Sequence, residues 1–266
     1  MKLITWNINS VRLRIGLVER VLKDYNPDVL CLQETKCPDE HFPLQQIQDM
    51  GYEHVHFQGM KSYNGLAIIS RVPFVAKDCH DRVGRDDCRH ISAGFKDFDL
   101  HNLYIPAGGD EPDPKVNDKY KHKLDFVEEM TDWFADAYTL DKPVVALGDF
   151  NIAPYEHDVW SHKQLLKVVS HTPPETERLA KMLGSLDWID SARHFIPEEE
   201  KTYSWWSYRN RDWKKSNRGR RLDHIWVTQP LKPALKAYDA PSDVRDWEKP
   251  SDHVPVILDL DLKKAA

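Results

Sequence analysis

The segment PVVALGDFN at residues 143–151 joins an apolar run directly to a polar cluster. The run Pro143–Leu147 has the length and composition of a buried strand. Gly148 allows a turn or a close approach of the backbone at the end of that strand. Asp149 and Asn151 are two residues apart, so they share one face of an extended segment. The segment therefore predicts a strand that carries two polar side chains to the rim of a sheet.

Three other segments repeat this pattern. Polar clusters at Thr5–Asn9, Leu32–Lys36 and Ser251–His253 adjoin apolar runs at Lys2–Trp6, Asp28–Leu32 and Val254–Leu260. Because all four strand ends carry Asn, Asp, Glu or His, we expect one polar site at one rim of a sheet. This mixture of oxygen ligands and titratable groups suits a hard metal ion and phosphate chemistry.

Strands and helices alternate along the rest of the chain. A helical stripe is formed by Leu13, Leu17, Val18, Val21, Leu22 and Tyr25, and further helices are expected at 115–138 and 175–183. Further strands are expected at 52–57, 65–70, 90–95, 99–105 and 221–228. Each half begins with a buried strand that ends in an Asn-bearing cluster. This weak similarity between the halves fits two packed sheets with helices outside, in a single domain spanning 1–266.

Bulk composition is that of an ordinary globular protein. The 266 residues are 41% hydrophobic and 30% charged, and no apolar run approaches the roughly 20 residues of a membrane helix. The chain enters a strand at once, without a signal-peptide pattern. Its four cysteines form no CxxC pair, so neither a zinc site nor a disulfide framework is indicated. We expect a cytoplasmic protein with no membrane partner, and nothing demands more than a monomer.

The charge distribution indicates a polyanionic partner despite a net charge of −6. Between Arg209 and Arg221 there are seven basic residues and one acidic residue, on an otherwise acidic chain. Such a strip is typical of contact with a phosphate backbone, although a solvated surface loop would have the same charge. Aromatic rings on which bases can stack favour binding. They are Tyr203, Trp205, Trp206, Tyr208 and Trp213.

Glu34 is the first candidate for metal binding. It follows a buried apolar strand, where an unpaired carboxylate is costly. A magnesium ion would supply the missing partner, although a salt bridge at a sheet edge would also do so. Asn7 and Asn9 share a face of their extended segment, and their oxygens can ligate or position an ion.

Asp149 and His253 are the candidates for proton chemistry. An Asp at position 149 could take a proton from a water that Asn151 orients, or it could cap an Asx-turn. A His held by an Asp on another strand has a fixed tautomer and orientation, and Asp223 is available to hold His253. Either residue alone is more often structural, but their joint occurrence at strand ends favours a catalytic site.

Seven motifs in this order resemble the exonuclease III type of abasic-site endonuclease, within the endonuclease/exonuclease/phosphatase superfamily. They are Trp6–Asn9, Leu32–Lys36, Asn102–Pro106, Gly148–Asn151, Tyr203–Arg209, Arg221–His224 and Ser251–His253. The resemblance runs essentially end to end. It implies an α/β fold, a four-layer sandwich of two packed, mainly antiparallel or mixed sheets flanked by helices. It also implies cleavage of duplex DNA 5′ to abasic sites, 3′→5′ exonuclease action and trimming of blocked 3′ ends.

The resemblance also implies residue roles. Glu34 would be the main ligand of Mg²⁺, for which Mn²⁺ is a possible substitute, with Asn7, Asp252 and Asn9 close to the ion. Asp149 would activate the attacking water and Asn151 would orient it. The scissile phosphate would be contacted by Tyr104 and by His253, which Asp223 holds.

For the substrate, the resemblance implies a pocket for a flipped-out abasic sugar, lined by Trp205 and Leu222. A residue without a base costs little to extrude from the duplex. Since adjacent strand residues face opposite ways, either Trp205 or Trp206 should belong to the core. Contact with DNA is expected from Arg209, Lys214, Lys215, Arg218 and Arg220.

Two positions depart from the family pattern. Ala107 stands where relatives often have Asn or Gln, and Arg220 stands where some have Trp. Both departures bear on the balance between endonuclease and exonuclease activity.

Two other functions are alternatives. A phosphatase or phosphodiesterase for inositol phosphates or lipids would not need Trp205, Leu222 and the basic strip. A catalytically silent DNA-binding module would have no reason to keep the whole candidate catalytic set.

Overall fold

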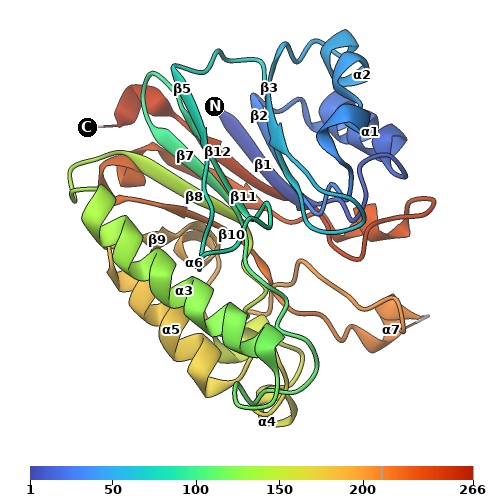
Figure 1. Ribbon diagram of the computed structural model, residues 1–266, viewed down its shortest axis with the longest axis vertical. Helices are drawn as coiled ribbons and strands as arrows, with labels where there is room; N and C mark the ends of the chain where they lie inside the picture. Colours follow the sequence, from blue (N-terminus) through green and yellow to red (C-terminus); the bar gives the residue numbers. More distant parts are fainter. Residues whose placement is uncertain (211, 266) are drawn as a thin grey trace.

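The computed structural model describes residues 1–210 and 212–265, and its strands form two six-stranded sheets packed face to face (Figure 1). The first sheet has the strand order β11-β12-β1-β2-β4-β3 and the second has β5-β6-β7-β8-β10-β9. Strands of the first sheet are β1 (Lys2–Asn7), β2 (Val29–Gln33), β3 (His54–Gln58), β4 (Leu66–Ser70), β11 (Leu235–Asp239) and β12 (Val256–Leu260). Strands of the second sheet are β5 (Ala76–Cys79), β6 (His90–Gly94), β7 (Asp99–Tyr104), β8 (Val144–Asp149), β9 (Ile189–Asp190) and β10 (Asp223–Val227).

Each sheet is antiparallel except for one parallel pair at its centre. The pairs are β1 with β2 and β7 with β8. A parallel pair needs a crossover connection, which contains α1 (Ile15–Tyr25) in the first sheet and α3 (Asp118–Ala137) in the second. Each sheet therefore contains one strand–helix–strand unit, β1–α1–β2 in the first and β7–α3–β8 in the second.

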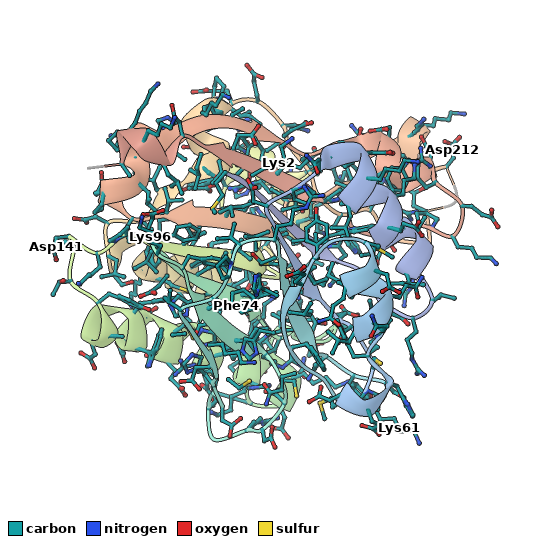
Figure 2. All side chains as sticks on the ribbon, turned by 90° about the horizontal axis from the view of Figure 1, so that it is seen from above. Lys2, Lys61, Phe74, Lys96, Asp141 and Asp212 are labelled. Carbon is teal, nitrogen blue, oxygen red and sulfur yellow. The ribbon has the colours of Figure 1, made fainter. Side chains whose placement is uncertain are left out.

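Alternation along the strands divides the apolar side chains between two sides of each sheet. In β8, Val145 and Leu147 face the first sheet, whereas Val144 and Ala146 face α3 and α5 (Pro173–Gly184). Side chains fill the space between the sheets, as the view from above shows (Figure 2). Because both faces of the central strands are covered, these strands are apolar on consecutive residues rather than on alternate ones.

Helices cover the outer faces of both sheets (Figure 1). α1 and α2 (Leu44–Asp49) pack on the first sheet, and α3 and α5 lie side by side on the second. The short helices are α4 (His162–Leu165), α6 (Ser191–Phe195) and α7 (Trp213–Ser216). Short 3₁₀ turns lie at Asp39–His41, Glu156–Asp158, Gln229–Ala234, Ser242–Asp246 and Leu262–Lys264. The predicted four-layer α/β sandwich is confirmed.

Local signals explain several helix boundaries. The side chain of Asn117 accepts hydrogen bonds from the first turn of α3, and α5 begins with a capping box between Thr172 and Glu175. Asn26, in left-handed conformation, ends α1. Leu13 was expected in the stripe of this helix, but α1 starts at Ile15 and Leu13 is 62% exposed.

Strands β5 and β11 were not predicted, because neither has an apolar pattern. All four residues of β5 are exposed at the sheet edge, and an edge strand can lack the apolar face on which prediction depends. Among the described residues, no helix combines the length and apolarity needed to cross a membrane.

Candidate active site

The side chains between the two sheets change from apolar to polar toward one rim. Along β1 the inward positions are Leu3, Thr5 and Asn7, and along β8 the last inward positions are Leu147 and Asp149. Beneath the rim lies a layer of amides. Gln33 Nε2 donates to Thr5 Oγ1 at 2.9 Å and to Asn102 Oδ1 at 2.7 Å. These bonds link the two sheets directly below the candidate site.

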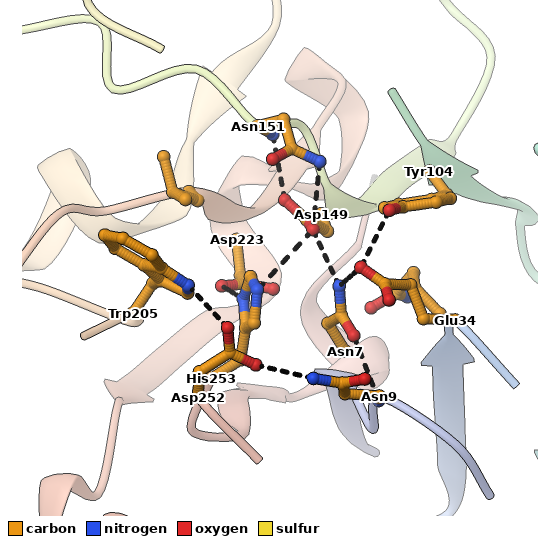
Figure 3. Close-up of polar contacts among 12 residues, drawn as sticks. Asn7, Asn9, Glu34, Tyr104, Asp149, Asn151, Trp205, Asp223, Asp252 and His253 are labelled. Atoms are coloured by element: carbon orange, nitrogen blue, oxygen red, sulfur yellow. Dashed lines mark hydrogen bonds and ion pairs between the residues drawn. The ribbon is translucent and has the colours of Figure 1, made fainter. Parts of the chain in front are cut away.

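Asp149 lies at the centre of the rim (Figure 3). Its Oδ2 accepts from Asn7 Nδ2 at 2.8 Å and Asn151 Nδ2 at 3.1 Å, and its Oδ1 accepts from the backbone of Asn151 at 2.9 Å. Burial raises the pKa of Asp149 to about 7, against the opposing effect of His253. Gly148 permits this arrangement because a Cβ there would lie 1.9 Å from the carbonyl oxygen of Leu103. A carboxylate with this pKa can exchange a proton near neutral pH.

His253 lies between two carboxylates. Its Nδ1 is 2.8 Å from Asp223 Oδ2 and its Nε2 is 3.7 Å from Asp149 Oδ2. Burial alone would lower the pKa of His253, but Asp223 and then Asp149 raise it to about 10. Ser204 also donates to Asp223 Oδ2, at 2.6 Å, which fixes that carboxylate. The imidazole is therefore doubly protonated and positively charged at neutral pH.

Glu34 faces Asp149 from the first sheet. Its Oε1 accepts from Tyr104 Oη at 2.7 Å and Asn7 Nδ2 at 2.9 Å, and Lys36 Nζ lies 2.6 Å from its Oε2. Burial opposes ionisation of Glu34, but Lys36 and these hydrogen bonds lower its pKa. Burial and the nearby carboxylates raise the pKa of Tyr104, so its hydroxyl remains a neutral donor.

Backbone strain coincides with the polar cluster. Asn9, Glu34 and Asn151 have φ values of 48°, 51° and 54°, in the left-handed region that is costly for residues other than glycine. Such strain is found where the surrounding structure fixes it, often at functional sites. At Glu34 the backbone is fixed from both sides, since its carbonyl accepts from Ser10 and the next amide donates to Gly65.

The oxygens around Glu34 are suited to a hard cation. Asn7, Asn9 and Asp252 continue from Glu34 in a hydrogen-bonded arc, in which Asn9 Nδ2 donates to Asp252 Oδ1 at 3.0 Å. The Lys36 ammonium, 2.6 Å from Glu34 Oε2 and 2.7 Å from Asn9 Oδ1, shows that these oxygens hold positive charge. An all-oxygen set of this kind fits Mg²⁺. Asp149, Asp223 and His253 also lie close enough together to hold a metal, but the two ring nitrogens of His253 face different carboxylates, which is the arrangement of a hydrogen-bonded imidazole rather than of three ligands around one ion.

A pocket of about 480 Å³ opens beside these residues. Trp205, Leu222, Val168 and Val169 form its apolar side, and Asn151, Glu34, Asp252 and His253 reach it from the polar side. Trp205 Nε1 donates to Asp252 Oδ2 at 2.9 Å, which fixes the ring (Figure 3). Trp206 is buried in the core, as expected for one of the pair. Ala107 lines the pocket without a polar side chain.

The basic strip divides into an exposed part and a buried part. Arg209, Lys214, Lys215 and Arg218 are exposed, and Lys214 pairs with Asp246. Arg221 is fully buried and bound by Asp158 and Asp190, so its inclusion in a surface strip was wrong. Arg211 lies outside the described residues.

Arg220 also differs from the exposed part of the strip. It is only partly exposed and donates to Val169 O at 3.0 Å and Ser170 Oγ at 2.7 Å in the pocket wall. The strip divides in this way because the segment returns to β10 and its last residues enter the fold.

Sequence reasoning missed three supporting residues. Lys36 lies in the motif Leu32–Lys36, but nothing in the sequence indicated a role for it. Ser204, which holds Asp223, has no sequence signal that separates it from other serines. Lys123 donates to Asn151 O at 2.7 Å from the buried face of α3, where its position among apolar helix residues was a signal that could have been read.

Comparisons with known proteins give the family. Residues 4–253 match the model of the endonuclease/exonuclease/phosphatase family. The chain is 30% identical over 267 residues to exodeoxyribonuclease III of Haemophilus influenzae, covering 96% of this chain and 98% of the relative. It is 31% identical over 273 residues to the DNA repair nuclease APEX1 of Danio rerio, covering 98% of this chain and 82% of the relative.

Solved structures agree. An AP endonuclease from Archaeoglobus fulgidus superposes with a TM-score of 0.92 at 32% identity, over 98% of this chain and 99% of that one. A 3′ phosphatase from Neisseria bound to a product DNA hairpin superposes with a TM-score of 0.90 at 31% identity, over 98% and 99%. The chain thus belongs to the endonuclease/exonuclease/phosphatase family and is a nuclease of its exodeoxyribonuclease III type.

Proposed function

We propose that this nuclease is a Mg²⁺-dependent DNA repair enzyme that cleaves duplex DNA 5′ to abasic sites. It would also remove nucleotides from 3′ ends and trim blocked 3′ ends. The observation that carries the proposal is Asp149 between an oxygen-rich arc and a protonated His253, beside a pocket lined by Trp205 and Leu222. All these residues come from one chain, so a monomer has a complete site.

In the proposed reaction, Asp149 accepts a proton from the attacking water. Asn151, whose amide lies 3.1 Å from Asp149 Oδ2, would orient that water. His253 Nε2–H would donate to a non-bridging phosphate oxygen, with Asp223 holding the ring through Nδ1. Tyr104 would add a neutral hydroxyl donor on the other side of the phosphate.

Glu34 would be the main ligand of the metal, with Asn7, Asn9 and Asp252 close to it. When bound, Mg²⁺ supplies positive charge for the phosphate oxygens and the departing 3′ oxygen. Mn²⁺, which also prefers oxygen ligands, is the expected substitute.

Specificity for abasic sites is supported by the apolar side of the pocket. Trp205 and Leu222 would contact a sugar that has lost its base and left the helix. The exposed residues Arg209, Lys214, Lys215 and Arg218, together with Arg220 in the pocket wall, would contact the phosphate backbone on either side.

The test is incision of a duplex with one stable abasic analogue, in Mg²⁺ and then in excess EDTA, beside an undamaged 3′-recessed duplex. We expect Mg²⁺-dependent incision 5′ to the analogue. Asp149→Asn should lose about 10²- to 10⁴-fold in kcat, the usual contribution of a general base, with its affinity for DNA kept. If neither duplex is cut in Mg²⁺ while inositol phosphates are hydrolysed, the proposal is wrong.

The inactive Asp149→Asn protein also tests the exposed basic residues. Its affinity should fall with rising salt, and Lys214→Ala with Lys215→Ala should reduce that salt slope by about one for each lost phosphate contact. An unchanged slope would mean that these lysines belong to a solvated loop and do not contact the phosphates of DNA.

A further inference from the structure

Beneath the pocket, α3 and α5 bring together a lysine and a glutamate that solvent does not reach. Lys123 and Glu175 are both 0% exposed, and Lys123 Nζ lies 2.5 Å from Glu175 Oε1. Such residues are almost never fully buried unless they are paired, and removing one partner leaves a costly buried charge. A buried pair is weak evidence for added stability, so its other contacts deserve a functional explanation.

The other two contacts of Lys123 lead to the active site. Its ammonium donates to Asn151 O at 2.7 Å and to Ala107 O at 3.3 Å. With Glu175, these acceptors use all three protons of the ammonium. Asn151 is in left-handed conformation, so the bond to its carbonyl holds a strained residue in place. The Asn151 amide in turn contacts Asp149 Oδ2 and Ile105 O.

Glu175 extends the same network to the wall of the pocket. Its carboxylate accepts from the backbone N–H of Ser170, at 2.8 and 2.9 Å, and from Thr172 N and Oγ1. Ser170 and the preceding Val168 and Val169 line the pocket. One ion pair therefore joins the loops that carry Ala107, Asn151 and Ser170, all three of which reach the pocket.

We propose that Lys123 is a positioning residue of this nuclease, which fixes Asn151 directly and fixes the pocket wall through Glu175. The inference rests on the roles proposed above for Asp149 and Asn151. Lys123 does not touch the reacting atoms, so its loss should lower kcat, with little change in KM. A decrease of about 10- to 100-fold is expected, as for other residues that orient a catalytic group.

The decisive variant replaces both members of the pair. Lys123→Met alone leaves Glu175 buried and charged, so it should lose both stability and kcat. In Lys123→Met/Glu175→Gln no charge remains, and the Gln carbonyl can still accept from Ser170 and Thr172. We therefore expect the free energy of unfolding to recover in the double variant, whereas kcat stays low because no donor reaches Asn151 O.

The matched control is Lys121→Met on the same helix. Lys121 is 58% exposed and pairs with the neighbouring Asp125 on the helix surface, so this variant should keep wild-type kcat and stability. Glu175→Gln alone leaves Lys123 buried without its carboxylate partner, so it should lose stability, as Lys123→Met does.

A double variant with wild-type kcat would overturn the proposal and leave the pair a purely structural role. If the double variant does not fold, single-turnover cleavage by the folded fraction of Lys123→Met replaces it, and a wild-type rate per folded molecule would overturn the proposal equally. Failure of the proposed function is distinguishable, because the wild-type protein would then cut neither duplex in Mg²⁺, whereas failure of the Lys123 proposal leaves wild-type incision intact.

Discussion

Buried histidines in two regions of this molecule differ in charge: His253 is positively charged, whereas His90 and His101 are neutral. At the rim between the sheets, His253 contacts the carboxylates of Asp223 and Asp149. On the outer face of the second sheet, under α3, His90 and His101 contact each other and Arg82. Burial lowers the pKa of all three rings, yet the pKa of His253 is raised to about 10 and that of His101 is lowered to about 3.

The partners of each ring explain the difference. Arg82 Nε can only donate, so His90 must accept at Nδ1 and carry its proton on Nε2. His90 Nε2 then donates to His101 Nδ1 at 2.9 Å, and His101 Nε2 donates to Tyr138 Oη at 2.7 Å. Each ring in this chain of donors carries one proton and no charge. His253 faces an acceptor on both sides and carries two protons.

The same reasoning decides where a metal fits. Ring nitrogens of His80, His90 and His101 lie within 4.8 Å of one another, a spacing that three ligands of one ion could have. However, His90 is protonated at the nitrogen that faces His101, and the Arg82 guanidinium adds positive charge beside it. Closeness of possible ligands is therefore not enough to indicate a metal site, and the oxygen-rich arc at Glu34 is the better candidate for one.

The largest effect expected from this comparison is on turnover. His253→Gln removes a charged donor beside the phosphate and should lower kcat on the abasic duplex by about 10²- to 10⁴-fold. His101→Gln keeps the order of donor and acceptor in the neutral chain, so the folded protein should keep its kcat. Single-turnover cleavage by both variants checks this.

The contrast between the clusters would be broken if both variants lost the same turnover. In that case His253 would serve the fold, as His101 does. Circular dichroism and unfolding curves of both proteins establish that only folded enzyme is compared.

The second effect is on the pH dependence of catalysis. With the pKa of Asp149 at about 7 and that of His253 at about 10 without a metal ion, the active form has Asp149 ionised and His253 protonated. At saturating Mg²⁺, kcat/KM should rise about tenfold per pH unit on the acid side, level off, and fall on the alkaline side. Because a bound cation lowers both pKa values, the rise should end at or below about pH 7 and the fall should begin at or below about pH 10. In His253→Gln the fall at high pH should disappear, and a fall that persists would mean that another group causes it.

The apolar runs with polar ends predicted β1, β2 and β8, and the resemblance to a known family implied the four layers. The sequence also indicated that Asn7, Glu34, Asp149 and His253 would meet, since each adjoins one end of an apolar strand. It could not predict the charge states. These depend on contacts such as Arg82 with His90, or Lys36 with Glu34, and a linear pattern does not encode such contacts.

The roles of the site residues and the single-domain organisation stay predictions. The basic strip shows the same limit of sequence reasoning in another way. Arg218 and Arg221 were grouped by their charge, but Arg218 is exposed and Arg221, at the start of the strand expected at 221–228, is buried against Asp158 and Asp190.

The smallest effect is on stability in acid, and it belongs to the neutral cluster. His101 has a pKa of about 3 when folded and about 6.5 when unfolded. Between these values the unfolded chain binds the extra proton, so the stability from this group is complete above pH 6.5 and decreases as the pH falls toward 3. At pH 5 the loss from His101 alone is about 2 kcal/mol.

His101→Gln removes this titration while keeping both hydrogen bonds. The free energy of unfolding of the variant should therefore fall less steeply than that of the wild type between pH 7 and pH 5, in denaturant titrations at each pH. Carboxylates elsewhere titrate in both proteins, so the difference between the two curves isolates the histidine. Parallel curves would mean that His101 takes up a proton in the folded state near its ordinary pKa. The neutral chain of donors from Arg82 to Tyr138 would then be wrong, and with it the contrast between the two clusters.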